Sequence, residues 1–320
     1  MSYDKENMLG VLQDFPEQCK EAVKLAKVSV KGKFSSICVC GMGGSGIGGD
    51  LLKSLVNNIP IYPVHGYKLP SYVDKKCLVI AVSFSGNTEE TLSCYKEAKK
   101  KKMKVISITS GGKLADLDKN AIIIPKDKYP DFQPRSAIGY LFLTMVAALS
   151  KNKIIPSQSG ALAEVNKILN PKLCSKQGFL LAQKLKNKIP VFYASEELGA
   201  AAYRIKTAVN ENAKQPSFYH IFPEMNHNEI NGFKRNTSKL AIVFLRDKKD
   251  NKAIIRRMDI TKKLIKSNVK TVDLEVHGKN LLARMMYSIY VGDFISYYLA
   301  LMNRLDPTPV PVVEELKKKL

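Results

Sequence analysis

The chain has 320 residues, of which 51 are Lys or Arg and 29 are Asp or Glu, so its formal net charge at pH 7 is +22. Hydrophobic residues make up 45% of the sequence and charged residues 25%, which is the composition of an ordinary globular protein. This length suggests two domains, each able to bury its own core. The positive charge is compatible with nucleic acid, an acidic surface or a small anion as partner, and it does not choose among them.

Two classes of protein are excluded by the start and the apolar runs of the sequence. Met1 is followed by the polar stretch 2–6, so we expect no targeting leader. The longest apolar run, 137–149, is too short to span a bilayer and predicts a buried helix, so we expect no membrane partner.

Cysteine use indicates a reducing compartment. No two cysteines have the Cys-x-x-Cys spacing, and none is paired with histidine at a zinc spacing. We therefore expect reduced, buried thiols and a cytoplasmic protein without a structural metal. The six cysteines are Cys19, Cys38, Cys40, Cys77, Cys94 and Cys174.

Strands and helices alternate along the first half of the chain. An amphipathic helix is expected over 6–28, and an apolar helix closes this half at 136–149. Between them the pattern predicts strands at 36–40, 61–64, 77–82, 105–109 and 121–124, with helices at 47–56 and 89–101.

A linker rich in Pro, Ser and Gly at 152–160 is followed by helical segments, after which the alternation restarts. The pattern predicts strands at 190–195, 217–221, 240–245 and 269–274, and helices at 198–214, 253–267, 280–305 and 312–320. Such alternation predicts an α/β fold of two doubly wound parallel-sheet domains. We place them at 1–152 and 153–320, with the boundary within about ten residues of Lys153.

The first glycine-rich loop, 41–50, lies between a strand and a helix and contains Gly-x-Gly-x-x-Gly. Backbone amides of such a loop can approach an anion at a helix N-terminus. A dinucleotide site would also need an acidic residue at the end of the next strand, but the segment 61–67 contains no Asp or Glu. No Gly-Lys-Ser/Thr follows the glycines, which excludes a P-loop. Glycines that serve only tight strand–helix packing remain an alternative, but the serine among them favours a loop that hydrogen-bonds its ligand through Ser45.

The second loop, 83–91, is more informative. Ser83, Ser85 and Thr88 crowd around Gly86, with Asn87 between them, and a helix begins directly afterwards. Hydroxyls and free amides at the positive end of a helix form a phosphate cradle. Simple helix capping by Ser85 or Thr88 is the alternative, although one hydroxyl would suffice for a cap.

These two loops together resemble a sugar-isomerase (SIS) domain, of flavodoxin-like type. The resemblance rests on two motifs: Gly-Met-Gly-Gly-Ser-Gly at 41–46 and, about forty residues later, Ser-x-Ser-Gly-Asn-Thr-x-Glu-Thr at 83–91. It implies that the second loop binds a phosphosugar. The residues expected to contact it are Gly44, Ser45, Ser83, Ser85, Gly86, Asn87 and Thr88.

Further segments, most of them in the second half of the chain, make the resemblance more specific. The segments 210–214 and 224–229, the arginine segment 134–140, and 306–310 with 315–317 resemble bifunctional phosphoglucose/phosphomannose isomerases. The four histidines suggest no zinc site, and a hydrolase elbow Gly-x-Ser-x-Gly is absent from the sequence. The resemblance covers 35–317 and implies two SIS domains.

The resemblance implies roles for four residues in aldose–ketose isomerisation. Glu211 would be the base that moves a proton between C1 and C2, and Arg135 would stabilise the enediolate. His227, contributed by the neighbouring subunit of a homodimer, would help to open the sugar ring. Lys317 would assist at the ring oxygen, although Lys318 or Lys319 of the same run could fill this role. No cofactor and no metal are implied.

The function expected from the sequence is therefore the interconversion of glucose 6-phosphate, and of mannose 6-phosphate, with fructose 6-phosphate. In the family, a threonine near the C-terminus goes with acceptance of both epimers, and Thr308 is the candidate here. Two alternatives remain at this point. One is a non-catalytic phosphosugar-binding SIS regulator, and the other, supported only by charge, is a nucleic-acid-binding protein, which the scattered lysines do not favour.

Overall fold

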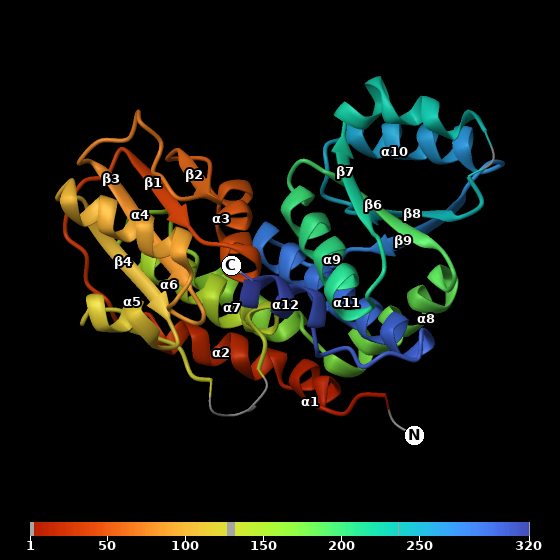
Figure 1. The fold of residues 1–320 in the computed structure, drawn as a ribbon. Helices are drawn as coiled ribbons and strands as arrows, with labels where there is room; N and C mark the ends of the chain where they lie inside the picture. The colour runs from red at the N-terminus through yellow and green to blue at the C-terminus, as the bar shows by residue number, and fades with distance from the viewer. Residues whose placement is uncertain (1–2, 127–131, 236, 320) are drawn as a thin grey trace. The chain divides into compact units, whose positions relative to one another are not determined.

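The computed structural model describes residues 3–126, 132–235 and 237–319 (Figure 1). The chain divides into two compact units. The first unit is Asp14–Lys167, and the second unit is Met1–Gln13 together with Ile168–Leu320. The segment Met1–Gln13 belongs to the second unit because α1 (Met8–Gln13) packs on α11 (Leu281–Met302), where the Tyr290 hydroxyl donates to the Leu12 carbonyl at 2.7 Å.

The first unit is built on a parallel sheet. Its strands are β1 (Ser36–Cys40), β2 (Ile61–Val64), β3 (Cys77–Ser83), β4 (Lys104–Thr109) and β5 (Ile122–Ile123). Its helices are α2 (Phe15–Leu25), α3 (Gly43–Leu55), α4 (Glu89–Lys100), α5 (Gly112–Leu117), η1 (Pro134–Ala137), η2 (Gly139–Leu143), α6 (Thr144–Lys151) and α7 (Ser159–Ile168).

The strand order in the first unit is β2-β1-β3-β4-β5 with every described pair parallel. Strands β1 and β3 are buried along their whole length, because helices cover both faces of the sheet. Under α4 the core contains four of the cysteines, at 38, 40, 77 and 94. All six cysteines are free and buried, as expected for small apolar core residues.

The second unit is built on a smaller parallel sheet. Its strands are β6 (Ile189–Ser195), β7 (Phe218–Phe222), β8 (Leu240–Arg246) and β9 (Lys270–Glu275). Its helical elements besides α1 and α11 are α8 (Pro171–Leu185), α9 (Gly199–Asn212), η3 (Glu224–His227), η4 (Glu229–Lys234), α10 (Lys252–Ile265) and α12 (Pro311–Lys319).

The strand order in the second unit is β7-β6-β8-β9, again parallel. Figure 1 shows α10 on one side of this sheet and α9 with α11 on the other. The core beneath α10 is aromatic, because Tyr193, Phe222 and Phe244 stack edge to face or tilted on one another. The other face is closed by α11, whose 22 residues are buried almost throughout.

The predicted fold class is confirmed: the chain forms two parallel-sheet α/β units. The predicted boundary at Lys153 stays a prediction beside the structural division at Lys167. In the described parts of the chain, every helix is too short or too polar to cross a membrane.

Three predicted elements differ from those observed, and the sequence pattern does not predict α5, η3 or η4. The helix expected over 6–28 is two helices, because Pro16 starts a new helix at the first turn of α2. The helix expected over 136–149 begins as the 3-10 turn η1 and the π turn η2. The Gln18 side chain from α2 enters this ladder, accepting from the Tyr140 amide and donating to the Ser136 carbonyl. The third difference is α3, which begins at Gly43 rather than Ile47.

Candidate functional site

The two loops singled out in the sequence lie at the carboxyl ends of β1 and β3. These are neighbouring strands whose following helices, α3 and α4, lie on opposite faces of the sheet. At such a point the two loops diverge and leave a crevice, which is where open parallel sheets bind ligands. The location follows from strand order alone.

Direct contacts join the first loop to the second loop and to the arginine segment. The buried Ser45 hydroxyl accepts a hydrogen bond from the Phe84 amide at 3.0 Å. A Cβ atom on Gly44 would lie 2.9 Å from both the Cα and the amide nitrogen of Arg135. Only glycine allows η1 to approach α3 this closely, so the fold brings Gly44, Ser45 and Arg135 together with the second loop.

The second loop is held in one conformation around Gly86. Gly86 has φ +70°, and a Cβ atom there would lie 1.8 Å from the Gly111 carbonyl oxygen. The Gly86 carbonyl accepts from the Leu114 amide at 2.9 Å, which fixes the loop to the start of α5. The glycine is therefore required both by its backbone angle and by its surroundings.

The hydroxyls of the second loop do more than cap α4. Thr88 occupies the N-cap position but its side chain makes no capping hydrogen bond; it is paired with the buried Ser83 hydroxyl at 2.9 Å. Ser85 and Asn87 are exposed, and the Ser85 hydroxyl accepts from the Asn87 amide at 3.2 Å. The first turn of α4 thus points toward this loop without a capping side chain, as an anion site at a helix N-terminus requires.

Arg135 is buried in η1, with only 4% of its surface exposed. Its guanidinium lies 3.4 Å from the Gln133 amide oxygen. Since arginine stays charged at any physiological pH, the fold buries a permanent positive charge in η1, the segment whose backbone packs against Gly44.

His65 and Asp50 were not identified as site residues in the sequence. The His65 Nε2 atom lies 3.0 Å from the Asp50 carboxylate, and its Nδ1 atom lies 3.0 Å from the Gly41 carbonyl. The bond to Asp50, and that to Gly41, raise the pKa of His65 against the opposing effect of partial burial. Through the Gly41 carbonyl, the pair holds the start of the first loop in place. The sequence signal that could have identified it is a histidine at the end of β2, the strand beside β1.

Glu211 lies in the last turn of α9, in the second unit, and is partly exposed. The helix end around it is anchored by its neighbours. The Asn212 amide donates to Ser296 of α11 at 2.9 Å, and the Lys214 ammonium donates to the Asn212 and Asp306 carbonyls. Glu211 therefore stands beside a fixed helix end.

His227 ends η3 and is exposed. Its loop is ordered by polar contacts at both ends: Asn228 donates to Glu224 at 2.9 Å, and the Tyr193 hydroxyl donates to Glu229 at 2.6 Å. Burial, with the Glu229 carboxylate, raises the pKa of Tyr193 strongly, so this tyrosine stays a hydrogen-bond donor.

The C-terminal candidates lie in two segments. Thr308 is buried, and its amide donates to the Asp306 carboxylate at 3.1 Å. Lys317 lies in α12, but its side chain, like that of Lys318, is outside the described part of the structure. Lys319 is paired with Glu315 at 2.6 Å.

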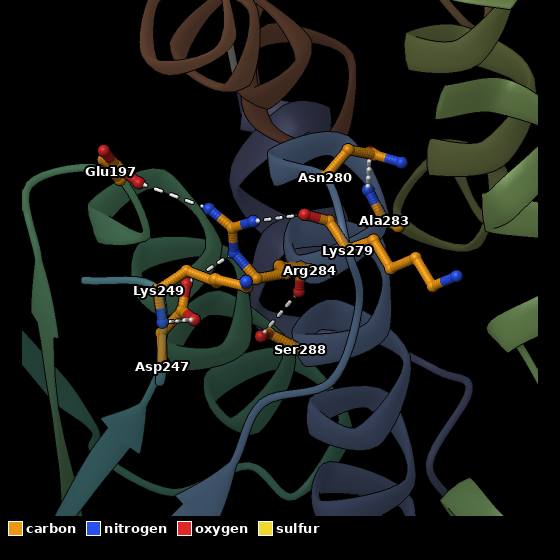
Figure 2. A network of polar contacts seen from close by, with 8 residues as sticks. All are labelled: Glu197, Asp247, Lys249, Lys279, Asn280, Ala283, Arg284 and Ser288. Carbon is orange, nitrogen blue, oxygen red and sulfur yellow. Dashed lines mark hydrogen bonds and ion pairs between the residues drawn. The ribbon is translucent and has the colours of Figure 1, made fainter. Parts of the chain in front are cut away.

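The corresponding crevice of the second unit is filled by an ion-pair network (Figure 2). The Arg284 guanidinium lies between Asp247, which follows β8, and Glu197, which follows β6, at 2.6 and 3.4 Å. Lys279 contributes its carbonyl to the same guanidinium. Side chains of the unit itself thus occupy the place where the first unit presents a hydroxyl-lined loop.

Among the described residues, no group of three or more His, Cys, Asp or Glu side chains could hold a metal ion. That catalysis needs neither metal nor cofactor stays a prediction.

The two sheets and the anion loops define a protein of two SIS-type domains. The chain matches the SIS domain model over residues 31–150 and the model "Bacterial phospho-glucose isomerase C-terminal SIS domain" over 176–320. The chain belongs to the bifunctional phosphoglucose/phosphomannose isomerase family. The predicted resemblance is thereby confirmed.

Similarity to individual proteins extends over nearly the whole chain. A bifunctional phosphoglucose/phosphomannose isomerase of Caldicellulosiruptor bescii is 40% identical, over 98% of each chain. That of Thermoplasma volcanium is 38% identical, over 94% of this chain and 96% of its own. Among solved structures, the C-terminal domain of glucosamine-fructose-6-phosphate aminotransferase from Francisella tularensis has a TM-score of 0.74 at 15% identity. The match covers 95% of this chain and 98% of that domain, and at this identity it shows a shared fold alone.

Proposed function

We propose that this protein interconverts glucose 6-phosphate and mannose 6-phosphate with fructose 6-phosphate. The observation that carries the proposal is the loop at the start of α4, where Gly86 and the Ser83–Thr88 pair leave Ser85, Asn87 and the first amides of the helix open to a ligand, in a chain of this isomerase family. The family's isomerases disfavour the alternative of a non-catalytic regulator. The reaction moves one proton between C1 and C2 of the open-chain sugar through a cis-enediol.

The phosphate is bound by the second loop. The exposed Ser85, the exposed Asn87 and the first amides of α4 supply neutral donors, and Gly86 lets the backbone come close. Hydrogen bonds to a charged group contribute about 1.5–3 kcal/mol each, so a few of them hold a phosphate without a lysine.

Four residues perform the chemistry in this proposal. His227 and Lys317 assist ring opening, which exposes the carbonyl carbon. Glu211 then takes the proton from C2 of the aldose, and the electron pair of the broken C–H bond moves through C1 to the carbonyl oxygen O1, which gives the enediolate. In the second half of the reaction the O2 hydroxyl proton passes to O1, C2 becomes the carbonyl carbon, and Glu211 returns its proton to C1. Arg135 stabilises the resulting enediolate with its fixed charge.

We further infer a cytoplasmic homodimer in which His227 of the partner subunit completes each site. The exposure of His227 at the end of η3 supports this arrangement, because the side chain is open to a second copy of the chain. Buried, free cysteines are compatible with a reducing compartment.

The test is turnover of each aldose phosphate by the purified protein, in a coupled assay with and without EDTA. We expect both substrates to be isomerised and EDTA to leave the rates unchanged. The Glu211→Gln variant should bind fructose 6-phosphate as the parent does while kcat falls about 10²–10⁴-fold, the usual contribution of a general base. A parent protein that turns over neither substrate refutes the proposed function; a fully active Glu211→Gln variant refutes only the role of Glu211.

A further inference from the structure

Helix α9 carries polar side chains into an otherwise apolar contact with α11. At the contact, Ile205 faces Gly292, where a Cβ atom would lie 2.4 Å from the isoleucine side chain. The Ile205 side chain therefore packs directly against the backbone of α11 at Gly292, where any larger residue would collide with it. Into this contact α9 places Arg204 and Asn212, which are 3% and 4% exposed. Buried polar groups of this kind need a structural or functional reason.

Their partners form a continuous polar row on α11. Arg204 Nη2 lies 2.9 Å from the Asp293 carboxylate. One turn further along α11, the Asn212 amide donates to the Ser296 hydroxyl at 2.9 Å, and that hydroxyl donates to the Asp293 carbonyl at 2.7 Å. Because the Ser296 proton is used in this second bond, Ser296 presents a lone pair to Asn212 and accepts only a donor there.

This row fixes the rotation of α9 about its own axis. Consecutive helical side chains point about 100° apart, so holding Asn212 against α11 sets the direction of Glu211, the preceding residue. A side-chain tip lies about 6 Å from the helix axis, so a rotation of about 20° would move the Glu211 carboxylate by about 2 Å. A displacement of about 1 Å can cost about a hundredfold in rate.

The last turn of a helix is also where fraying begins, because its carbonyls have no partner inside the helix. Here the Lys214 ammonium binds the Asn212 carbonyl at 3.1 Å, and the Asn303 amide binds the Ala213 carbonyl at 3.3 Å. Asn212 is thus held by its side chain and by its main chain, directly after the proposed base.

We propose that Asn212, through Ser296, is a positioning residue for the Glu211 carboxylate. The inference rests on the proposed function, in which Glu211 moves the proton. In this proposal the buried Asn212 amide, which does not reach solvent, controls the geometry of the proton transfer by Glu211.

The test compares Ser296→Thr with Ser296→Val. Threonine and valine have the same shape, so any packing strain is common to both and only the hydroxyl differs. We expect Ser296→Val to lower kcat about tenfold to a hundredfold with KM changed less than about twofold, and Ser296→Thr to keep most of the activity. Adding Asn212→Leu to Ser296→Val should lower kcat no further, because both changes break one interaction.

The outcomes separate the two proposals. Equal kcat values for the Thr and Val variants, in an active parent that requires Glu211, would overturn the role of Asn212 and leave the proposed function intact. A parent without turnover would refute the proposed function itself. If both Ser296 variants fail to fold, kcat and KM of Asn212→Leu are compared with those of the parent protein instead. An unchanged kcat in this variant overturns the inference.

Discussion

Single residues in the first unit fix the conformation of the loop 83–88, the proposed phosphate site. Ser83, Ser85 and Thr88 are identified from their spacing around Gly86, and the pattern lies within six residues of sequence. Their actual partners were not predictable: Thr88 pairs with Ser83 instead of capping α4, and Ser45 binds Phe84, 39 residues away. The conformation of each hydroxyl depends on neighbours that packing brings in.

Gly86→Ala is predicted to disrupt this loop. The left-handed backbone angle alone costs an alanine about 1–2 kcal/mol, and the new methyl group would collide with the Gly111 carbonyl. We expect the free energy of unfolding to fall by about 2 kcal/mol or more and fructose 6-phosphate binding to be lost. Denaturant unfolding and calorimetric titration measure the two effects.

Gly66→Ala is the matched control, because a Cβ atom there meets no atom within 4 Å. It should leave both stability and binding close to those of the parent. If Gly86→Ala and Gly66→Ala unfold at the same denaturant concentration, the argument from the Gly86 geometry is wrong.

At the scale of elements, the sequence located nearly every strand but not how the helices begin. Hydrophobic runs predict β1 and β3 well because both faces of these strands are buried, whereas α3 starts at Gly43, four residues before the predicted start. Glycine has low helix propensity, so the local pattern argues against a helix at 43–46. Packing against η1 overrides that preference.

The β8–α10 loop contains a carboxyl group whose ionisation opposes folding. Asp250 is 6% exposed, and burial, together with the nearby Asp247 and Glu197 carboxylates, raises the pKa of Asp250 to about 6. The Ser195 hydroxyl and the Arg284 guanidinium act in the opposite direction. The folded protein therefore keeps a proton that the unfolded chain releases near pH 4.

Stability should consequently fall as the pH rises from about 4 through about 6, because the folded state binds more protons in this range. Asp250→Asn removes the effect. We expect the variant to be more stable than the parent by up to about 3 kcal/mol at pH 8, and the difference to shrink toward pH 4. Thermal unfolding of both proteins between pH 4 and 8 measures this. A difference that does not grow with pH would show that ionisation of Asp250 is not responsible.

At the scale of the whole molecule, the proposed sharing of residues between subunits makes a quantitative prediction. If each site takes Glu211 from one subunit and His227 from the other, a mixed dimer of Glu211→Gln and His227→Ala has one intact site. Random mixing of the two inactive variants should then restore about a quarter of the parent activity.

The variants are mixed in denaturant and refolded together, and activity is measured against each variant refolded alone. Sedimentation of the parent establishes whether it is a dimer. A dimer whose mixed variants recover no activity would mean that Glu211 and His227 act within one subunit, and a monomer would exclude sharing altogether.

The sequence by itself determined the α/β class and the two sheets, and it predicted anion binding by the loops, because strand burial, helix periodicity and hydroxyls beside glycine are local properties. The net charge of +22 determined none of these, since the side chains from which the phosphate site is predicted, Ser83, Ser85, Asn87 and Thr88, are neutral. Only the tertiary structure decided that Gly44 admits Arg135, that Asn212 binds Ser296 84 residues away, and that Arg284 fills the crevice of the second unit. Such contacts join distant parts of the chain, and their geometry is set by the packing of whole helices and sheets, which no local pattern encodes.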